Sequence, residues 1–250
     1  MRFLNIIPII LSFLNITNTS NNFNDFIYPE INKTNDKIFV KFINRSDKNE
    51  FPKKIINDSL GVSVSAKSIL VRDLKTDKIL FSKNKDDKRQ IASITKLMSA
   101  IIMKDLNVDP EKIIEITKED SRGDFSKTKL LVGDKLKFKD LLSDSLIVSS
   151  NSGVLSAIKN AGISEEDFVK KMNQRAREMG LKNTYFADPT GLNNENVSTA
   201  DEILKITKLA FSYPEIKSET AQKKYSFQVE SGRKIEVSNT NELIGSYLNI

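Results

Sequence analysis

The sequence of 250 residues contains no cysteine and no histidine. Without cysteine, the chain has no thiol nucleophile, no disulfide and no zinc–thiolate site. Without histidine, it cannot form a Ser-His-Asp triad, and it lacks the commonest ligand of transition metals. If the chain is a hydrolase, its general base must therefore be Lys, Asp or Glu, and we expect neither a metal ion nor another cofactor.

The sequence also lacks the features of a nucleic-acid-binding protein. Its formal net charge is +6, and a basic balance can favour a polyanionic partner. However, Lys, Asn and Ile are abundant throughout, and the chain has no Arg-rich run and no basic stripe interleaved with aromatic residues. We therefore predict no nucleic-acid partner. Its 39% hydrophobic content is enough for one sizeable folded domain.

The N-terminus has the composition of a secretory signal. Residues 1–16 hold one Arg and then a run of Phe, Leu, Ile and Pro that is short for a membrane span. No clear cleavage site of small residues follows. We predict a signal peptide or an N-terminal anchor over residues 1–19, with a buried strand or helix as the alternative. The protein is then exported, periplasmic or otherwise extracytoplasmic, and an uncleaved segment would hold it at the cytoplasmic membrane.

Residues 20–60 are rich in Asn, Lys and Asp and are predicted to form a spacer. A short strand is expected within it at Ile38–Phe42. From residue 61 onward, apolar patterns typical of a folded domain begin.

The most informative stretch is Ile91–Met103, a mostly apolar segment that predicts a helix. Ser93 and Lys96 are three residues apart, so their side chains share one face of this helix. Lysine is rarely buried without a reason, and apolar surroundings would lower its pKa. A neutral amine beside a hydroxyl is a base beside a nucleophile. The plain alternative is a chance tetrad with a solvated lysine, because Ser-x-x-Lys recurs at Ser82/Lys85, Ser126/Lys129, Ser156/Lys159 and Ser231/Lys234.

A second polar segment, Ser149–Gly153, separates two apolar helical patterns. Polar residues in such a place can face a cleft, and they can equally form an ordinary helix cap. The other expected elements have clear boundaries from turn and cap residues. They are strands at Val64–Val71 and Lys78–Phe81, helices at Phe138–Val148, Val154–Ala161, Ser164–Met179 and from Ser198 or Thr199 to Ala210, and a hairpin of Tyr225–Val229 with Lys234–Val237.

Several motifs in a fixed order resemble serine D-Ala-D-Ala carboxypeptidases, the low-molecular-mass penicillin-binding proteins. The resemblance covers Val62–Ile250, so a catalytic domain is assigned to residues 61–250. It implies an α+β fold of the β-lactamase/transpeptidase type, with a helical cluster packed on an antiparallel sheet. The motifs are Ala92–Ala100 with Ser-x-x-Lys, Leu131–Asp134, Asp140–Leu142, Ser149–Asn151 with Ser-x-Asn, Phe186–Leu192, Ser198–Asp201 and Asn239–Leu243.

The resemblance implies a role for four residues. Ser93 would be the nucleophile and its backbone amide part of the oxyanion hole, and Lys96 would be its base during acylation. Ser149 would shuttle a proton to the leaving amine, and Asn151 would donate a hydrogen bond to the substrate backbone. The implied substrate is a peptidoglycan stem peptide, and β-lactam antibiotics would acylate the same serine.

One family motif, Lys-Thr-Gly on a strand, does not occur in these 250 residues. In the family it follows the Asn-Thr-Asn-x-Leu segment by roughly a dozen residues and belongs to a five-stranded sheet. We therefore expect a chain truncated before this motif, with an incomplete sheet and low activity in the 250-residue form. A lone strand pair is marginally stable.

Three alternatives to a carboxypeptidase remain open on the sequence. A DD-endopeptidase of the same fold would cut cross-links instead of removing a terminal residue. A serine β-lactamase would need a deacylating glutamate on a loop before the last motif, and the Asp188–Asn196 turn offers Glu195. An inactive fragment or a degenerate wall-binding remnant would keep the fold without turnover.

Overall fold

The computed structural model of the protein describes five stretches of the chain. The signal or anchor predicted at residues 1–19 lies outside them, as does much of the spacer at 20–60. Within the spacer, β1 (Ile27–Thr34) pairs antiparallel with β2 (Lys37–Asn44), and β2 contains the strand expected at Ile38–Phe42. The described stretches are residues 27–34, 37–44, 52–54, 63–121 and 128–246.

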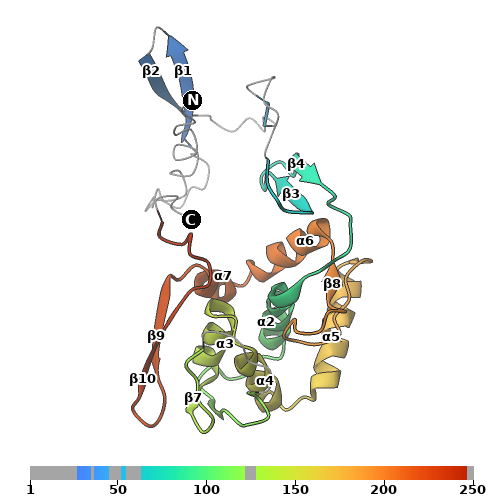
Figure 1. Ribbon diagram of the computed structural model, residues 1–250, viewed down its shortest axis with the longest axis vertical. Coiled ribbons are helices and arrows are strands. Elements are labelled where there is room, and N and C mark those ends of the chain that lie inside the picture. Colours follow the sequence, from blue (N-terminus) through green and yellow to red (C-terminus); the bar gives the residue numbers. More distant parts are fainter. Residues whose placement is uncertain (1–26, 35–36, 45–51, 55–62, 122–127, 247–250) are drawn as a thin grey trace.

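Helices make up the body of the domain and surround α2 (Thr95–Asp105), as Figure 1 shows. Helix α2 directly follows a single 3₁₀ turn, η1 (Ala92–Ile94). Helices α3, α4, α5 and α6 all contact α2. The remaining helices are α3 (Phe138–Ile147), α4 (Asn151–Asn160), α5 (Glu165–Glu178), α6 (Ala200–Ala210) and α7 (Pro214–Thr220).

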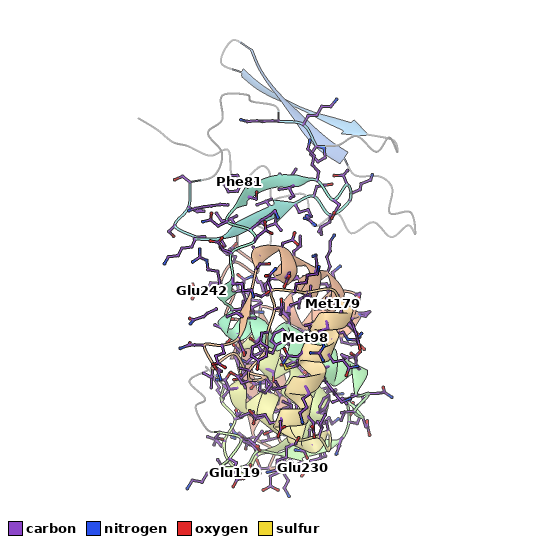
Figure 2. All side chains as sticks on the ribbon, turned by 90° about the vertical axis from the view of Figure 1, so that its right-hand side faces the viewer. Phe81, Met98, Glu119, Met179, Glu230 and Glu242 are labelled. Carbon is purple, nitrogen blue, oxygen red and sulfur yellow. The ribbon has the colours of Figure 1, made fainter. Side chains whose placement is uncertain are left out.

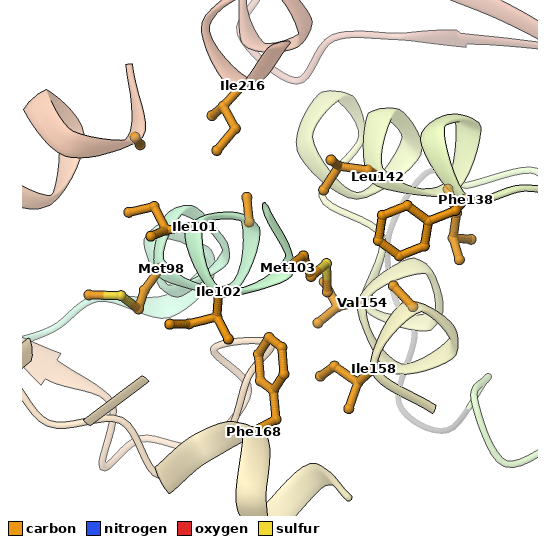
Figure 3. Close-up of a cluster of buried hydrophobic side chains, with 14 of the residues drawn as sticks. Met98, Ile101, Ile102, Met103, Phe138, Leu142, Val154, Ile158, Phe168 and Ile216 are labelled. Atoms are coloured by element: carbon orange, nitrogen blue, oxygen red, sulfur yellow. The ribbon is translucent and has the colours of Figure 1, made fainter. Parts of the chain in front are cut away.

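The core forms on α2 because this helix is apolar around nearly its whole circumference. Met98 and Ile101 are fully buried. Figure 3 shows the apolar side chains of α2 facing Phe138 from α3, Val154 from α4 and Phe168 from α5. Met98 lies inside the body of side chains in Figure 2 as well. Burial on this scale fixes α2, and with it the residues at its N-terminal end.

The helix boundaries follow the capping residues. The hydroxyl of Ser164 caps α5 and that of Thr199 caps α6, each accepting a hydrogen bond from a backbone amide three residues on, as predicted. Helix α4 begins at Asn151 and not at Val154, because Ser150 is its cap and accepts from the Gly153 amide at 3.0 Å. Helix α7 was not predicted from the sequence. It begins at Pro214, and proline is tolerated in the first turn of a helix.

The strands form five antiparallel pairs, and no pair has a third strand within the described residues. The predicted first strand pair is present, but β3 starts at Ile69 and not at Val64. The segment before Ile69 is small and polar, and Val64 is exposed. The four pairs beyond β1–β2 are β3 (Ile69–Arg72) with β4 (Ile79–Lys83), β5 (Arg89–Gln90) with β8 (Val197–Ser198), β6 (Ile113–Glu115) with β7 (Lys135–Lys137), and β9 (Lys224–Gln228) with β10 (Lys234–Ser238).

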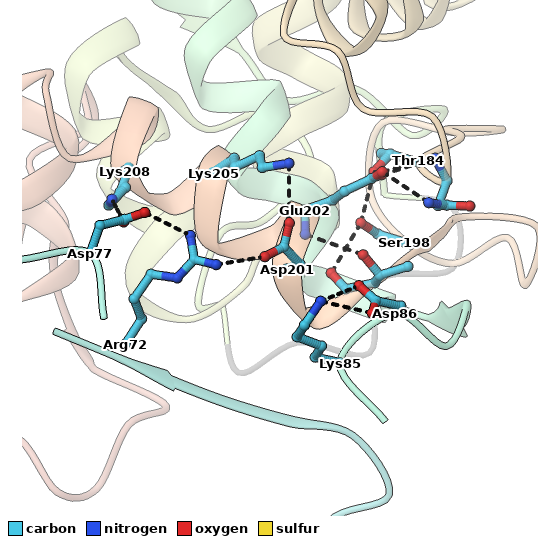
Figure 4. Close-up of polar contacts among 12 residues, drawn as sticks. Arg72, Asp77, Lys85, Asp86, Thr184, Ser198, Asp201, Glu202, Lys205 and Lys208 are labelled. Carbon is cyan, nitrogen blue, oxygen red and sulfur yellow. Dashed lines mark hydrogen bonds and ion pairs between the residues drawn. The ribbon is translucent and has the colours of Figure 1, made fainter. Parts of the chain in front are cut away.

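Ion pairs connect the β3–β4 hairpin to α6 (Figure 4). The guanidinium of Arg72 lies 3.0 Å from the carboxylate of Asp201, and both side chains are mostly buried. Lys208 contacts Asp77 at 3.1 Å on the exposed side of the same junction. Elsewhere, no helix in the described part of the chain is long and apolar enough to cross a membrane.

Candidate active site

Ser93 and Lys96 meet at the N-terminal end of α2. Ser93 lies in η1 and is exposed, whereas Lys96 is in the first turn of α2 and is only 4% exposed. The Lys96 Nζ atom lies 3.1 Å from Ser93 Oγ. The geometry expected from the spacing is therefore present: an accessible hydroxyl with a buried amine directly beneath it.

Two further oxygens hold the Lys96 amine. Its Nζ donates to Asn151 Oδ1 at 2.7 Å and to the backbone carbonyl of Thr190 at 2.8 Å. A buried amine needs such partners, because an unpaired polar group away from water is costly. These contacts join three parts of the chain far apart in sequence: the start of α2, the start of α4 and the loop before β8.

Of the four predicted site residues, the structure joins Ser93, Lys96 and Asn151 by hydrogen bonds. Ser149 stands at the α3–α4 junction two residues before Asn151 and is half-buried. Within the described part of the chain, no hydrogen bond connects Ser149 to Ser93 or Lys96. Its φ is +63°, a left-handed conformation that is unusual for a residue other than glycine and that is often found at functional sites.

The loop of residues 187–196 supplies the Thr190 carbonyl and is held in shape by Asp188. The Asp188 carboxylate accepts from the backbone amides of Thr190 at 2.5 Å and Gly191 at 2.7 Å, and from that of Asn193. Burial alone would raise the pKa of Asp188, but these hydrogen bonds outweigh burial and hold the pKa below its ordinary value. The carboxylate is thus the centre around which the loop folds.

Asn196 attaches this loop to both sides of the nucleophile. It is fully buried, its Nδ2 donates to Thr95 Oγ1 at 2.9 Å, and its backbone carbonyl accepts from the Ile91 amide at 3.1 Å. Its Oδ1 accepts from the amides of Ala187 and Asp188. The side chain therefore links the loop to α2, and the backbone links it to the residues just before Ser93.

Gly191 packs directly on the peptide that precedes Ser93. A Cβ atom built on Gly191 would lie 2.0 Å from the Ala92 carbonyl oxygen and 2.9 Å from the Ser93 nitrogen. Its φ of +92° also favours glycine. Ala92 itself has a φ of +42°, so the chain is locally strained immediately before the nucleophile.

Other candidates from the sequence are not placed at this centre. Glu195, the candidate deacylating residue, is exposed, and its backbone amide makes a turn contact with Asn193. Of the other Ser-x-x-Lys tetrads, Ser126 lies outside the described residues, and the three that begin at Ser82, Ser156 and Ser231 do not open a buried helix. Among the described residues, no group of three or more acidic, His or Cys side chains is arranged to hold a metal ion.

The part played by the 187–196 loop was not predicted from the sequence. Asp188–Gly191 was expected to form a turn and Phe186–Leu192 belongs to a family motif, but neither was given a role. The contact with Lys96 is made by the backbone carbonyl of Thr190, and any residue type could supply such a carbonyl. An Asp two residues before a Thr-Gly pair does indicate a turn held by a carboxylate, and that signal could have identified Asp188.

Residues 54–250 match a family model described as D-alanyl-D-alanine carboxypeptidase. The chain is 34% identical over 192 residues to a D-alanyl-D-alanine endopeptidase of Pseudomonas aeruginosa, covering 75% of this chain and 61% of that protein. It is 31% identical over 188 residues to a D-alanyl-D-alanine carboxypeptidase of Bacillus subtilis, covering 73% of this chain and 48% of that protein. The chain thus spans about half to three fifths of the length of these relatives.

The crystal structure of the Streptomyces K15 DD-transpeptidase resembles this fold with a TM-score of 0.64 at 26% identity. The match covers 69% of this chain and 72% of that one. This confirms the predicted fold class: α+β, with a helical cluster and small antiparallel strand pairs in the β-lactamase/transpeptidase arrangement.

Proposed function

Because the chain belongs to the D-alanyl-D-alanine carboxypeptidase family, we propose that it is a serine DD-peptidase that cleaves peptidoglycan stem peptides through an acyl-enzyme on Ser93. The observation that carries this proposal is the buried Lys96 amine 3.1 Å from the exposed Ser93 hydroxyl. A weak nucleophile needs an adjacent base, and this chain has no histidine to provide one.

The first half of the reaction is acyl transfer. Neutral Lys96 accepts the proton of the Ser93 hydroxyl while Oγ forms a bond to the carbonyl carbon of the penultimate D-Ala. The resulting tetrahedral intermediate collapses when the bond from this carbon to the nitrogen of the terminal residue breaks. The amine leaves with a proton, and an ester to Ser93 remains.

The second half is hydrolysis. Water attacks the ester carbon, gives up a proton, and releases the shortened peptide as a carboxylate, while Ser93 Oγ regains its proton. Ser149 is proposed to carry the proton to the leaving amine, because it flanks Asn151 at the edge of the same site. Asn151 is proposed to bind the substrate backbone through its amide while its Oδ1 holds Lys96.

The type of bond that is cut has two candidates. Our first proposal is a carboxypeptidase that removes the terminal D-Ala, the activity after which the family is named. The second is an endopeptidase that cuts peptide cross-links, and three relatives named D-alanyl-D-alanine endopeptidase, at 33–34% identity, favour it. Either activity places the protein at the cell wall, outside the cytoplasm.

The test of the nucleophile uses a fluorescent penicillin and mass spectrometry of the labelled peptide. We expect one label per chain on Ser93, no label in Ser93→Ala, and normal label in Ser82→Ala, a serine from another Ser-x-x-Lys tetrad. A folded wild-type chain that takes no label, or a label that survives in Ser93→Ala, contradicts the proposal. Rapid loss of the label with release of hydrolysed penicillin would instead indicate a β-lactamase.

The two peptidase activities are separated by digesting purified sacculi and analysing the released muropeptides. A carboxypeptidase shortens pentapeptides to tetrapeptides and leaves cross-linked dimers intact. An endopeptidase converts dimers to monomers. No change in either product in the presence of a chain that labels with penicillin would point to a wall-binding protein without turnover.

A further inference from the structure

Lys96 makes contacts that distinguish its two protonation states. As an ammonium it has three N–H donors, and Ser93 Oγ, Asn151 Oδ1 and the Thr190 carbonyl are three acceptors. As a neutral amine it has two donors and one lone pair. The two acceptors that cannot donate, Asn151 Oδ1 and the Thr190 carbonyl, then take the two N–H groups. The lone pair is left facing the Ser93 hydroxyl, the only partner of the three that can donate to it.

This orientation depends on where the Thr190 carbonyl sits. The carbonyl belongs to a loop, and a loop carbonyl is well placed only if the loop is fastened on both sides. On one side, the Ser99 hydroxyl of α2 donates a hydrogen bond to the neighbouring Pro189 carbonyl at 2.6 Å. A second attachment is Asn196, whose side-chain amide forms hydrogen bonds both to Thr95 in α2 and to the loop backbone.

We propose that Asn196 is a positioning residue for acylation: it holds the 187–196 loop so that the Thr190 carbonyl orients the lone pair of Lys96 toward Ser93. This inference rests on the proposed function, because it assumes that Lys96 is the base for Ser93. Among the described residues, no hydrogen bond joins Asn196 directly to Ser93 or Lys96. Its effect passes through Thr95 on one side and through the loop backbone on the other.

The structure supplies a matched control at the residue that precedes this loop, Phe186. Asn173 in α5 also uses both ends of its amide on this residue: Nδ2 donates to the Phe186 carbonyl at 2.7 Å and Oδ1 accepts from the Phe186 amide at 3.0 Å. Asn173 thus fastens the residue just before the loop with a comparable number of hydrogen bonds, and among the described residues none of its hydrogen bonds reaches α2. Loss of general loop stability and loss of lysine orientation can therefore be separated.

The experiment measures acylation by a fluorescent penicillin in the full chain, resolving the initial binding constant from the acylation rate constant. We expect Asn196→Ala to lower the acylation rate constant about tenfold or more, because a small misplacement of a reacting group costs this much. Thr95→Val, which keeps the shape and removes the hydroxyl, should lower it severalfold. The initial binding constant should stay within about twofold in both variants, and Asn173→Ala should acylate at nearly the wild-type rate.

The proposal is overturned if folded Asn196→Ala and Thr95→Val acylate at the wild-type rate, or if Asn173→Ala is slowed equally. Should Asn196→Ala not fold, as judged by thermal unfolding, Thr95→Val decides the question. Should the wild-type chain not react at all, the proposed function fails first. Hydrogen exchange then still tests the attachment itself: the Ile91 amide, which donates to the Asn196 carbonyl, should exchange faster in Asn196→Ala than in Asn173→Ala, and equal rates contradict it.

Discussion

At the scale of single residues, the two central groups of the site, the Ser93 hydroxyl and the Lys96 amine, differ in their exposure to solvent. Ser93 is open to solvent and Lys96 is 4% exposed directly beneath it. The hydroxyl can therefore meet a substrate while the amine is kept from water by the packing of α2. Three oxygen acceptors offset the cost of burying the amine. Residues that hold Ser93 and Lys96 in these positions should therefore tolerate only very small changes of side-chain size.

Gly191 is the residue at which the smallest substitution should have the largest effect. In Gly191→Ala the new methyl group would lie 2.0 Å from the Ala92 carbonyl oxygen, so the peptide before Ser93 must move. We expect loss of penicillin labelling and a fall in stability of more than about 2 kcal/mol, since backbone strain adds to the clash. The control is Gly133→Ala, which has nearly the same φ of +90° and nothing within 4 Å. It should cost about 1–2 kcal/mol and leave labelling intact; equal loss in both variants would refute a role for the close contact.

Asp188 gives a prediction with a defined pH dependence. Its pKa in the folded chain lies below the ordinary value of 3.8. Its contribution to stability is therefore complete above about pH 4 and is lost as the pH falls through the lowered pKa. We expect Asp188→Asn to lower the free energy of unfolding by about 1–2 kcal/mol at pH 7, with the gap to wild type narrowing below pH 4. Urea unfolding of both proteins at pH 7 and below pH 4 tests this. A difference in unfolding free energy that stays constant between the two conditions would contradict it.

At the scale of elements, the sequence predicted those whose pattern is local. Helices α3, α5 and α6 were expected because each has an apolar face and clear boundary residues. The hairpins β3–β4 and β9–β10 were expected from turns between short apolar runs. The β5–β8 pair could not be predicted, because two-residue strands show no alternation. The same holds for the 187–196 loop, whose contacts with α2 depend on backbone groups and on a distant Asn. Ser93, Lys96 and Asn151 were found from motifs, but only the fold shows that Lys96 connects them.

The junction of α3, α7 and β9 carries a prediction at this scale. Burial, together with the nearby charge of Asp140, raises the pKa of Glu219 on α7 above its ordinary value. Ionised Glu219 is therefore unfavourable, and stability is lost as the pH rises through its raised pKa. Glu219→Gln should raise the unfolding temperature at pH 7 by a few degrees, about 1 kcal/mol or less, and have no effect near pH 4.

Glu215, on the same helix, is the control for this change. A hydrogen bond from Lys104 lowers the pKa of Glu215, so its ionised form is favourable. Glu215→Gln should leave the unfolding temperature at pH 7 unchanged or slightly lower it. If both substitutions shift the unfolding temperature in the same direction, the environment of Glu219 is not what determines the effect.

At the scale of the whole molecule, the β3–β4 hairpin and the helical body are joined at a charged junction. The hairpin lies against α6, and the chain leaves it toward β5 and then Ser93 (Figures 1 and 4). Its outer residues include several exposed apolar side chains, such as Leu74 and Leu80. The attachment to α6 therefore depends heavily on Arg72, which reaches Asp201 in α6 at 3.0 Å. Arg72 also lies 3.4 Å from Asp77 in the turn of its own hairpin.

Arg72→Gln should loosen this attachment. The Arg72–Asp201 pair is mostly buried. Removal of the guanidinium leaves Asp201 paired with Lys205 but without its buried partner, at a cost of about 1–3 kcal/mol. We expect faster hydrogen exchange in residues 69–83 and earlier proteolytic cleavage there, with little change in α2. Lys208→Gln, which removes the exposed pair with Asp77, should change the free energy by no more than about 0.5 kcal/mol. If exchange in α2 rises as much as in the hairpin, the junction is not a separate unit, and the hairpin and helices unfold as one.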